Sequence, residues 1–318
     1  MSAASPAPAS SASARPRSVV VALGPVDADE VTPHLPEHAQ FVPDPGADDL
    51  AVAEGAIVRA AFTLDRAMLD RMPRLRIIAR TGVGVDRVDL DAARERGIPV
   101  AITPGSNSRA VAEGAFTMLA SLIKNLGESH RYVSAGEWGR APVPEAGDLH
   151  GRTLAVLGYG RIGRIVAGFG RAFGMHVIAH DPFVSADDAE NVSLEDAVRR
   201  ADALTLHLPG GGSELLPLAI LRSAKPGLVL VNCARADLVS TATLQEGLES
   251  GILGGVGLDV FEDEPVQRHP LAGRTDVLLS PHTTGFSRAA RRETVRMAAV
   301  AVGEVLGGRY PTFTVGDA

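Results

Sequence analysis

A glycine-rich turn between an apolar run and a helical segment constrains the fold of this chain more than any other feature. Residues 154–157 are typical of a buried strand, and Gly158, Gly160 and Gly163 follow in the spacing G-x-G-x-x-G, before a helical segment that runs through Phe173. Gly158 permits a tight turn, Gly160 lets the backbone approach a pyrophosphate, and Gly163 lets helix and strand pack closely. The helix N-terminus offers free N–H groups to that phosphate. The segment therefore predicts a dinucleotide-binding turn.

The next predicted strand ends at an acidic residue that strengthens this interpretation. Residues 176–180 lead into Asp181, about twenty residues past the glycines, where a ribose-binding acid belongs. A carboxylate there accepts hydrogen bonds from both ribose hydroxyls and repels a 2′-phosphate. Pro182 and Phe183 follow, with no arginine to neutralise such a phosphate. The sequence favours NAD over NADP, and the alternative is that Asp181 is an ordinary turn residue at a strand end.

Apolar runs and helical segments alternate along the whole chain, which predicts an α/β fold with parallel sheets. Helices are predicted at 89–96, 108–124 and 289–306, and residues 133–150 are expected to form an irregular arm or linker. The pattern divides into two α/β units, the second of which runs from 108 to 287. The other predicted strands are Ser18–Leu23, Ala56–Arg59, Leu75–Arg80, Val100–Ile102, Ala203–Leu208, Val229–Asn232, Gly255–Val260 and Val277–Leu279.

Composition excludes several classes of partner. The formal charge is -7 with no basic stretch, which argues against nucleic acid. Residues 1–18 are rich in Ala, Ser and Pro, and we expect a disordered tail without the apolar core of a signal peptide. No run is long enough to span a bilayer. Cys233 is the only cysteine, so an intrachain disulfide is impossible and a reducing cytoplasm fits.

Further motifs carry a resemblance to a known family. They are Arg80-Thr81-Gly82-Val83-Gly84-Val85-Asp86, Thr103-Pro104-Gly105-Ser106-Asn107 with Val111-Ala112-Glu113, Leu206-His207-Leu208-Pro209, Val231-Asn232-Cys233-Ala234-Arg235, Leu258-Asp259-Val260-Phe261, Glu264-Pro265 and Ser280-Pro281-His282. With the glycine turn, they stand in the order found in the D-2-hydroxyacid dehydrogenases. The chain resembles this family from about residue 56 to 308, and within it the D-3-phosphoglycerate dehydrogenase branch.

The resemblance implies two Rossmann-like parallel-sheet domains with the active site in the cleft between them. A discontinuous substrate domain, 19–107 and 288–318, would hold an inserted NAD-binding domain, 108–287. It also implies a homodimer built through the NAD-binding domains, with the segment 130–150 in the contact. Because the sequence ends at residue 318, we expect no C-terminal regulatory domain. The resemblance places Arg161, Ile162, His207, Leu208, Pro209, Cys233, Ala234 and Asp259 at the cofactor.

Hydride transfer to a 2-oxo acid requires a group that holds the carboxylate and a group that delivers a proton. Arg235 matches the family's arginine, and its planar guanidinium can pair with two oxygens at once. His282 matches the acid/base, a role that suits an imidazole near neutral pH. Glu264 matches the carboxylate that bonds to this imidazole, although Glu262 and Asp263 lie beside it. Catalysis is therefore predicted for Arg235, Glu264 and His282, and we assign no metal site.

The substrate contacts are less sharply defined. The loop of Gly82, Val83 and Gly84 should present backbone N–H groups to the substrate carboxylate, and the alternative is a plain turn. Arg59 and Arg80 would add positive charge for a phosphorylated or doubly anionic substrate, or would pair with structural acids. Asp259 would face the nicotinamide amide, or would cap its strand end.

The expected activity is an NAD-dependent D-2-hydroxyacid dehydrogenase or 2-oxo acid reductase acting on a 3-phosphoglycerate-like anion. Ala236-Asp237 stands where two glycines are common, and Thr284-Gly285-Phe286 where smaller residues often occur. These departures leave open glyoxylate, hydroxypyruvate, formate or a phosphonate-bearing oxo acid as the substrate. An NAD-sensing protein like the family's corepressors is the alternative from another functional class.

Overall fold

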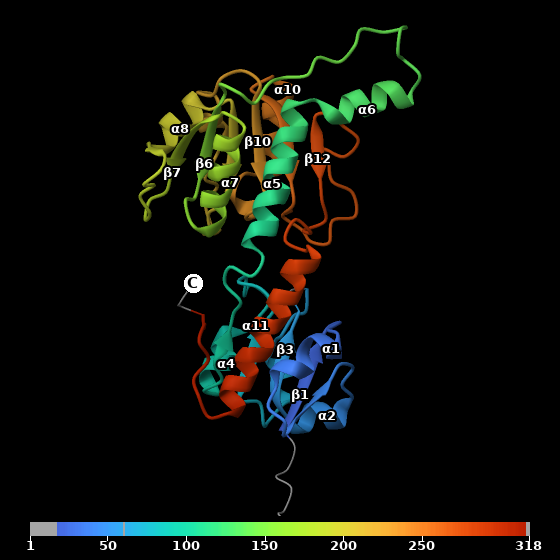
Figure 1. Cartoon of the computed structure of the whole chain (residues 1–318), viewed down its shortest axis with the longest axis vertical. Coiled ribbons are helices and arrows are strands. Elements are labelled where there is room, and N and C mark those ends of the chain that lie inside the picture. Colours follow the sequence, from blue (N-terminus) through green and yellow to red (C-terminus); the bar gives the residue numbers. More distant parts are fainter. Residues whose placement is uncertain (1–17, 60, 316–318) are drawn as a thin grey trace, which may run out of the picture. The chain divides into compact units, whose positions relative to one another are not determined.

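The computed structural model describes residues 18–59 and 61–315. The predicted tail therefore lies outside the described residues except for Ser18, which begins the first strand. The chain forms two compact α/β units, one comprising the residues up to Ser106 together with those from Arg292, and the other Asn107–Arg291. Both are built on parallel sheets (Figure 1). No helix in the described ranges is both long and apolar enough to cross a membrane.

The first unit contains a five-stranded sheet in the order β2-β1-β3-β4-β5. Its strands are β1 (Ser18–Leu23), β2 (Ala39–Val42), β3 (Ala53–Val58), β4 (Ile77–Arg80) and β5 (Val100–Ala101). Its helices are α1 (Ala28–Val31), η1 (Thr32–His34), α2 (Ala47–Val52), α3 (Arg66–Asp70), α4 (Leu90–Glu95) and the part of α11 (Arg288–Leu306) that follows Arg291. One face of the sheet packs on α11, because Gly55 has no side chain and a Cβ there would lie 2.8 Å from Val302 Cγ1.

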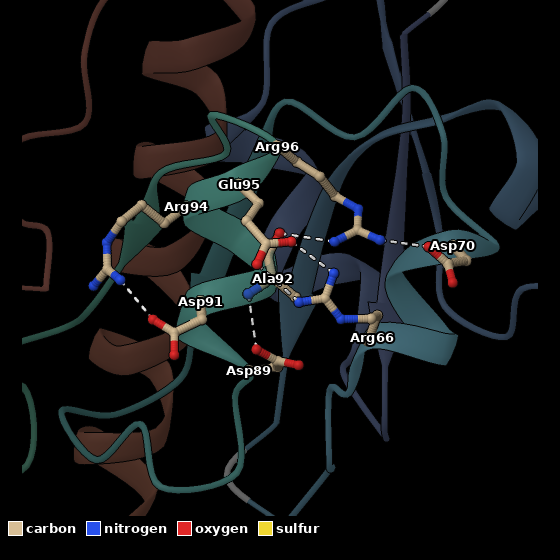
Figure 2. Close-up of polar contacts among 8 residues, drawn as sticks. All are labelled: Arg66, Asp70, Asp89, Asp91, Ala92, Arg94, Glu95 and Arg96. Atoms are coloured by element: carbon tan, nitrogen blue, oxygen red, sulfur yellow. Dashed lines mark hydrogen bonds and ion pairs between the residues drawn. The ribbon is translucent and has the colours of Figure 1, made fainter.

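The other face of this sheet is covered partly by α3 and α4. The exposed surfaces of these two helices carry ion pairs (Figure 2). Arg66 donates to both oxygens of Glu95 at 2.7 and 3.1 Å, and Asp89 caps α4 by accepting from the N–H of Ala92 at 2.8 Å. The cap satisfies an N–H group that the helix itself leaves unbonded. Exposed ion pairs contribute little to stability, so the buried face of the sheet is what holds this unit together.

The second unit contains a seven-stranded parallel sheet in the order β12-β11-β10-β9-β6-β7-β8. Its strands are β6 (Thr153–Leu157), β7 (His176–His180), β8 (Glu190–Asn191), β9 (Ala203–Leu206), β10 (Leu228–Asn232), β11 (Leu253–Leu258) and β12 (Val277–Leu279). Its helices are α5 (Ser108–Ile123), α6 (Leu126–Ser134), α7 (Arg161–Ala172), α8 (Leu194–Arg200), α9 (Leu218–Leu221), η2 (Ala236–Leu238) and α10 (Thr241–Glu249). Helices α5 and α7 lie side by side over one face (Figure 1).

Strand order determines where a ligand can bind in this unit. The chain passes from β6 to β7 on one side and then crosses to β9 on the other side of β6. In open parallel sheets, ligands bind beyond the carboxyl ends of the strands at such a switch point. The motifs that follow β6, β7, β9, β10, β11 and β12 all emerge at this one edge, so the topology collects them there.

The bounds of β3, β4, β9 and β11 differ by two or three residues from the predicted ones, and three further elements depart from the prediction. Helix α6 extends to Ser134, into the segment expected to be irregular, and only Tyr132 of its residues is buried. Strands β2 and β8 were not predicted. Strand β2 has no fully buried residue, and β8 consists of two exposed residues at the sheet edge. Such elements depend on pairing with a neighbouring strand and carry little apolar pattern of their own.

Candidate active site

The glycine turn lies between β6 and α7 and has the packing that its sequence predicts. Gly158 has a φ of +94°, and a Cβ there would lie 2.6 Å from the backbone carbonyl of His207. At Gly163 a Cβ would lie 2.0 Å from the carbonyl oxygen of Gly158, so helix and turn are in direct backbone contact. Gly160 is the N-cap of α7, and a Cβ there would meet no atom within 4 Å. Two glycines are needed for packing, and the third leaves open space at the helix N-terminus.

This open space fits the pyrophosphate of a dinucleotide. The first N–H groups of α7 have no partner within the helix, and a phosphate bound there also meets the positive end of the helix dipole. Arg161 and Ile162, which begin α7, are exposed and partly exposed, respectively. Their contact with the cofactor remains a prediction.

Asp181 follows β7 and ties the glycine turn to this strand. Its Oδ2 accepts from the N–H of Tyr159 at 2.7 Å, and its Oδ1 accepts from the N–H groups of Phe183 and Val184 at 2.8 and 3.0 Å. The carboxylate is thus held beside the turn by three backbone donors. Since a carboxylate offers about four acceptor sites, these bonds leave about one for a ribose hydroxyl, and the contact with the ribose stays a prediction.

His207 follows β9, and its backbone carbonyl packs against Gly158 of the glycine turn. Its Nε2 is 3.0 Å from the hydroxyl oxygen of Thr205, while its Nδ1 is buried and makes no hydrogen bond within the part of the chain that the model describes. Burial lowers the pKa of His207 to about 3, so the ring is neutral at physiological pH. The loop continues through the partly buried Leu208 and the exposed Pro209.

Asn232 shapes the turn that carries the predicted substrate arginine. This residue ends β10, is fully buried, and accepts from the N–H of Ala234 at 3.0 Å while its amide donates to the carbonyl of Arg235 at 2.8 Å. The guanidinium of Arg235 donates to the carbonyl of Ala234 at 2.8 Å. The sequence prediction assigned Asn232 no function of its own, although its buried amide after a buried strand is a signal for a turn anchor.

Asp237 is one of the two residues that stand after Arg235 where glycines are common, and it binds a neighbouring loop. Its carboxylate accepts from the N–H groups of Gly211 and Gly212 at 3.0 and 3.3 Å. A Cβ on Gly210 would lie 2.6 Å from the same carboxylate. Asp237 therefore ties the arginine turn to the glycine-rich loop that follows Pro209, a contact that glycine could not make.

Cys233 lies in the same turn, and its thiol is held protonated. Burial, aided by the negative charge of Asp259, raises the pKa of Cys233 to about 12. The thiolate fraction at about pH 8 is then on the order of one in ten thousand.

We expect iodoacetamide to leave Cys233 unmodified in the folded protein at that pH and to alkylate it after denaturation, as measured by intact mass. Rapid alkylation of the folded protein would show that the thiol is ionised and accessible.

Of the three consecutive acids Glu262, Asp263 and Glu264, the last contacts the imidazole of His282. Its Nδ1 lies 2.9 and 3.1 Å from the two oxygens of Glu264. Glu264 also accepts from the N–H of Phe261 at 3.1 Å, while Glu262 accepts from the N–H of Thr241 at 2.8 Å. The side chain of His282 is 54% exposed, so the ring is accessible from solvent. With Nδ1 engaged by Glu264, Nε2 is the nitrogen that can exchange a proton.

Asp259 follows β11 and is buried, with 2% of its surface exposed. Its carboxylate accepts from the N–H groups of Thr283 and Thr284 at 2.8 and 3.1 Å. These bonds are to the segment that follows β12, and the predicted role as a cap of the strand end is not tested by them. A contact with the nicotinamide amide stays a prediction.

The predicted substrate residues of the first unit lie at the ends of two paired strands: Arg59 follows β3, Arg80 ends β4, and Gly82–Gly84 belong to the loop after β4. Arg80 is only 4% exposed, and it donates to the carbonyl of Gly84 at 3.0 Å and to that of Arg59. Burial lowers its pKa. Gly82 has a φ of +142°, and Val83 is exposed. Arg80 thus bonds to the backbone of Arg59 and of Gly84. Substrate binding by Arg59, Arg80 and Gly82–Gly84, and the alternative pairing of the two arginines with acids, stay predictions.

The comparisons with known proteins agree on one family. Residues 116–284 match the NAD binding domain of the D-isomer specific 2-hydroxyacid dehydrogenases. The chain is 36% identical over 265 residues to D-3-phosphoglycerate dehydrogenase of Mycobacterium leprae, covering 81% of this chain and 50% of that protein. It is 37% identical over 262 residues to (S)-sulfolactate dehydrogenase of Chromohalobacter salexigens, covering 80% and 84%. The chain spans about half the length of the first of these relatives.

A solved structure shares the fold over most of its length. D-lactate dehydrogenase of Aquifex aeolicus, in complex with NAD and lactic acid, superposes with a TM-score of 0.77 at 27% identity, covering 91% of this chain and 96% of that one. Sequence and fold therefore lead to the same assignment. The chain belongs to the D-isomer specific 2-hydroxyacid dehydrogenase family and carries its NAD-binding domain.

Proposed function

We propose that the protein is an NAD-dependent dehydrogenase that interconverts a small D-2-hydroxy acid and the corresponding 2-oxo acid. The observation that supports it most is the pairing of His282 with Glu264 in the same unit as the glycine turn. In this proposal residues 108–287 form the NAD-binding domain, and 19–107 with 288–318 form the substrate domain.

The chemistry divides between the cofactor and two side chains. The nicotinamide, when bound, accepts or supplies the hydride at C2. As the hydroxy acid is oxidised, its hydroxyl proton passes to Nε2 of His282, and in the reverse direction His282 returns this proton to the new alkoxide. Glu264 holds the imidazole ring and fixes Nδ1 as the nitrogen that faces the carboxylate. Arg235 binds the substrate carboxylate through its planar guanidinium.

The substrate class in this proposal is a small acid with a second anionic group, similar to 3-phosphoglycerate. The names of the relatives state both a phosphorylated and a sulfonated substrate, which supports a further anion without selecting one. The test is a panel of 2-oxo acids, including 3-phosphohydroxypyruvate, 3-sulfopyruvate, hydroxypyruvate, glyoxylate and a phosphonate-bearing acid, followed by NADH oxidation. Binding of NADH without turnover of any of them would favour an NAD-sensing protein instead.

We expect the protein to use NADH in preference to NADPH. Asp181 would place a negative charge beside the 2′-phosphate of NADP, and the next residues, Pro182 and Phe183, provide no cation. The measurement is kcat/KM for both cofactors on the best substrate of the panel. Equal or better use of NADPH would contradict this prediction.

We also expect a homodimer that uses α6 and the segment after it. Leu126, Val133, Trp138 and Val143 are exposed there, with Trp138 at 75% exposure. Large apolar side chains that gather in one exposed segment are typical of an interface. Sedimentation equilibrium should give twice the monomer mass, and Trp138→Glu should weaken the association because it places a charge in the contact. A monomer at all protein concentrations would rule this out.

A further inference from the structure

The backbone of His282 adopts a conformation that it would not keep without external support. Its φ is +56°, in the left-handed region that non-glycine residues seldom occupy. Such a residue persists only where the surrounding structure over-determines it. The segment leaves β12 through Ser280 and Pro281, and the N–H of His282 donates to the carbonyl of Ser280 at 2.9 Å. This local bond alone does not fix the residues that follow His282.

The carboxylate of Asp259 supplies the missing constraints on both sides of the histidine. Before it, the hydroxyl of Ser280 donates to Oδ1 of Asp259. After it, the N–H of Thr283 donates to the same oxygen at 2.8 Å. Oδ2 receives both the N–H of Thr284, at 3.1 Å, and the hydroxyl of Thr284. Four bonds thus fasten three residues that flank His282.

These four bonds occupy the acceptor capacity of Asp259. A carboxylate offers about four lone-pair sites, two on each oxygen. Each oxygen of Asp259 accepts two bonds from the segment Ser280–Thr284. A nicotinamide amide that binds Asp259, the contact predicted from the sequence, would share or displace one of these bonds.

Thr284 is held from a second direction. A Cβ added to Gly114 of α5 would lie 2.7 Å from both Cβ and Cγ2 of Thr284. The methyl group of Thr284 therefore fills the space left by Gly114, while its hydroxyl bonds to Asp259. Alanine at position 284 would have neither the Cγ2 methyl group nor the hydroxyl that makes these contacts.

We infer that Asp259, Ser280 and Thr284 form a clamp that positions His282 for proton transfer by fixing its backbone while Glu264 fixes its ring. Asp259 and Thr284 are then positioning residues that act through His282 rather than on the substrate. This inference rests on the proposed function only for the reaction that the histidine serves, because the conformation of His282 can be measured without substrate.

The direct test compares Thr284→Val with Thr284→Ser and Thr283→Val. Valine keeps the shape of threonine but loses the hydroxyl, whereas serine keeps the hydroxyl. Thr283→Val is the matched control, because Thr283 is exposed and bonds to Asp259 through its backbone N–H, which the substitution retains. The readout is the imidazole ¹H–¹³C NMR signal of His282, identified by its loss in His282→Gln. Kinetics on the best 2-oxo acid provide a second readout.

We expect one sharp signal at the parent position in the parent, Thr283→Val and Thr284→Ser proteins, and a shifted or broadened signal in Thr284→Val. The kcat of Thr284→Val should fall about ten- to a hundredfold, since small misplacements of a reacting group have effects of that order. Its KM for NADH should change little. Gly114→Ala, which crowds Thr284 without touching the hydroxyl and favours the helix, should shift the same signal.

Two results would overturn the clamp. The first is an unchanged His282 signal in both Thr284→Val and Gly114→Ala. The second is a loss of NADH affinity in Thr284→Val with kcat unchanged, which would assign Asp259 and Thr284 to the cofactor. If no 2-oxo acid is turned over, the proposed function fails, but the NMR comparison still decides whether the clamp holds His282.

Discussion

Replacing His282 by alanine is expected to lower turnover by roughly two to four orders of magnitude. The variant loses an imidazole that is paired with a carboxylate at the sheet edge where the motifs emerge. NADH binding should remain, because the glycine turn is built from other residues of the same unit. The measurement is kcat on the best 2-oxo acid, with the NADH dissociation constant from fluorescence as the control.

The partnership of His282 with Glu264 makes this prediction more specific. Glu264→Gln should lower turnover less than His282→Ala, because the imidazole stays but loses the negative charge that favours its protonated form. The double variant should be little slower than His282→Ala alone, since a missing imidazole needs no partner. If the two effects multiply instead, Glu264 is the wrong carboxylate, and Glu262 or Asp263 becomes the candidate.

Arg235→Ala is expected to lower kcat/KM for the 2-oxo acid by about a hundredfold or more. The lost interaction is a charged, two-pronged contact with the substrate carboxylate, and lysine should restore only part of it because an ammonium group has no planar fork. The affinity for NADH should stay near that of the parent protein. Steady-state kinetics and a fluorescence titration separate the two effects.

Arg222→Ala provides the matched control for this experiment. Arg222 belongs to the same unit but lies on its surface, where it pairs with Glu246 at 3.5 Å. Its loss should leave kcat/KM near the parent value. Equal kinetics for Arg235→Ala and Arg222→Ala would remove Arg235 from the site.

The sequence predicted long buried elements more accurately than short edge elements, for a physical reason. Strand β1 has the bounds that its apolar run predicts, and β6 and β10 each begin one residue before theirs, because burial itself produces the pattern. Strand β8 consists of Glu190 and Asn191, both exposed, and it exists only through pairing with β7. Helix α6 shows the same limit, since most of its apolar side chains stay exposed.

In the candidate site, too, some contacts were predicted from the sequence and others were not. The sequence correctly predicted that Glu264 meets His282. Glu264 follows β11 and His282 follows β12, and the carboxyl ends of these parallel strands lie at one edge of the sheet. The sequence did not predict that Arg80 bonds to backbone carbonyls or that Asp259 accepts four bonds from one segment. These contacts depend on loop conformations, including the left-handed backbone of His282, for which an isolated sequence carries no pattern.

The most direct test of the central claim follows the hydride itself. NADH that carries deuterium at both positions of C4 of the nicotinamide is mixed with the protein and the best 2-oxo acid, and the product is analysed by mass spectrometry and chiral chromatography. The account predicts a D-2-hydroxy acid that carries deuterium at C2 and whose yield falls with His282→Ala. A product without deuterium at C2, or of L configuration, would contradict it.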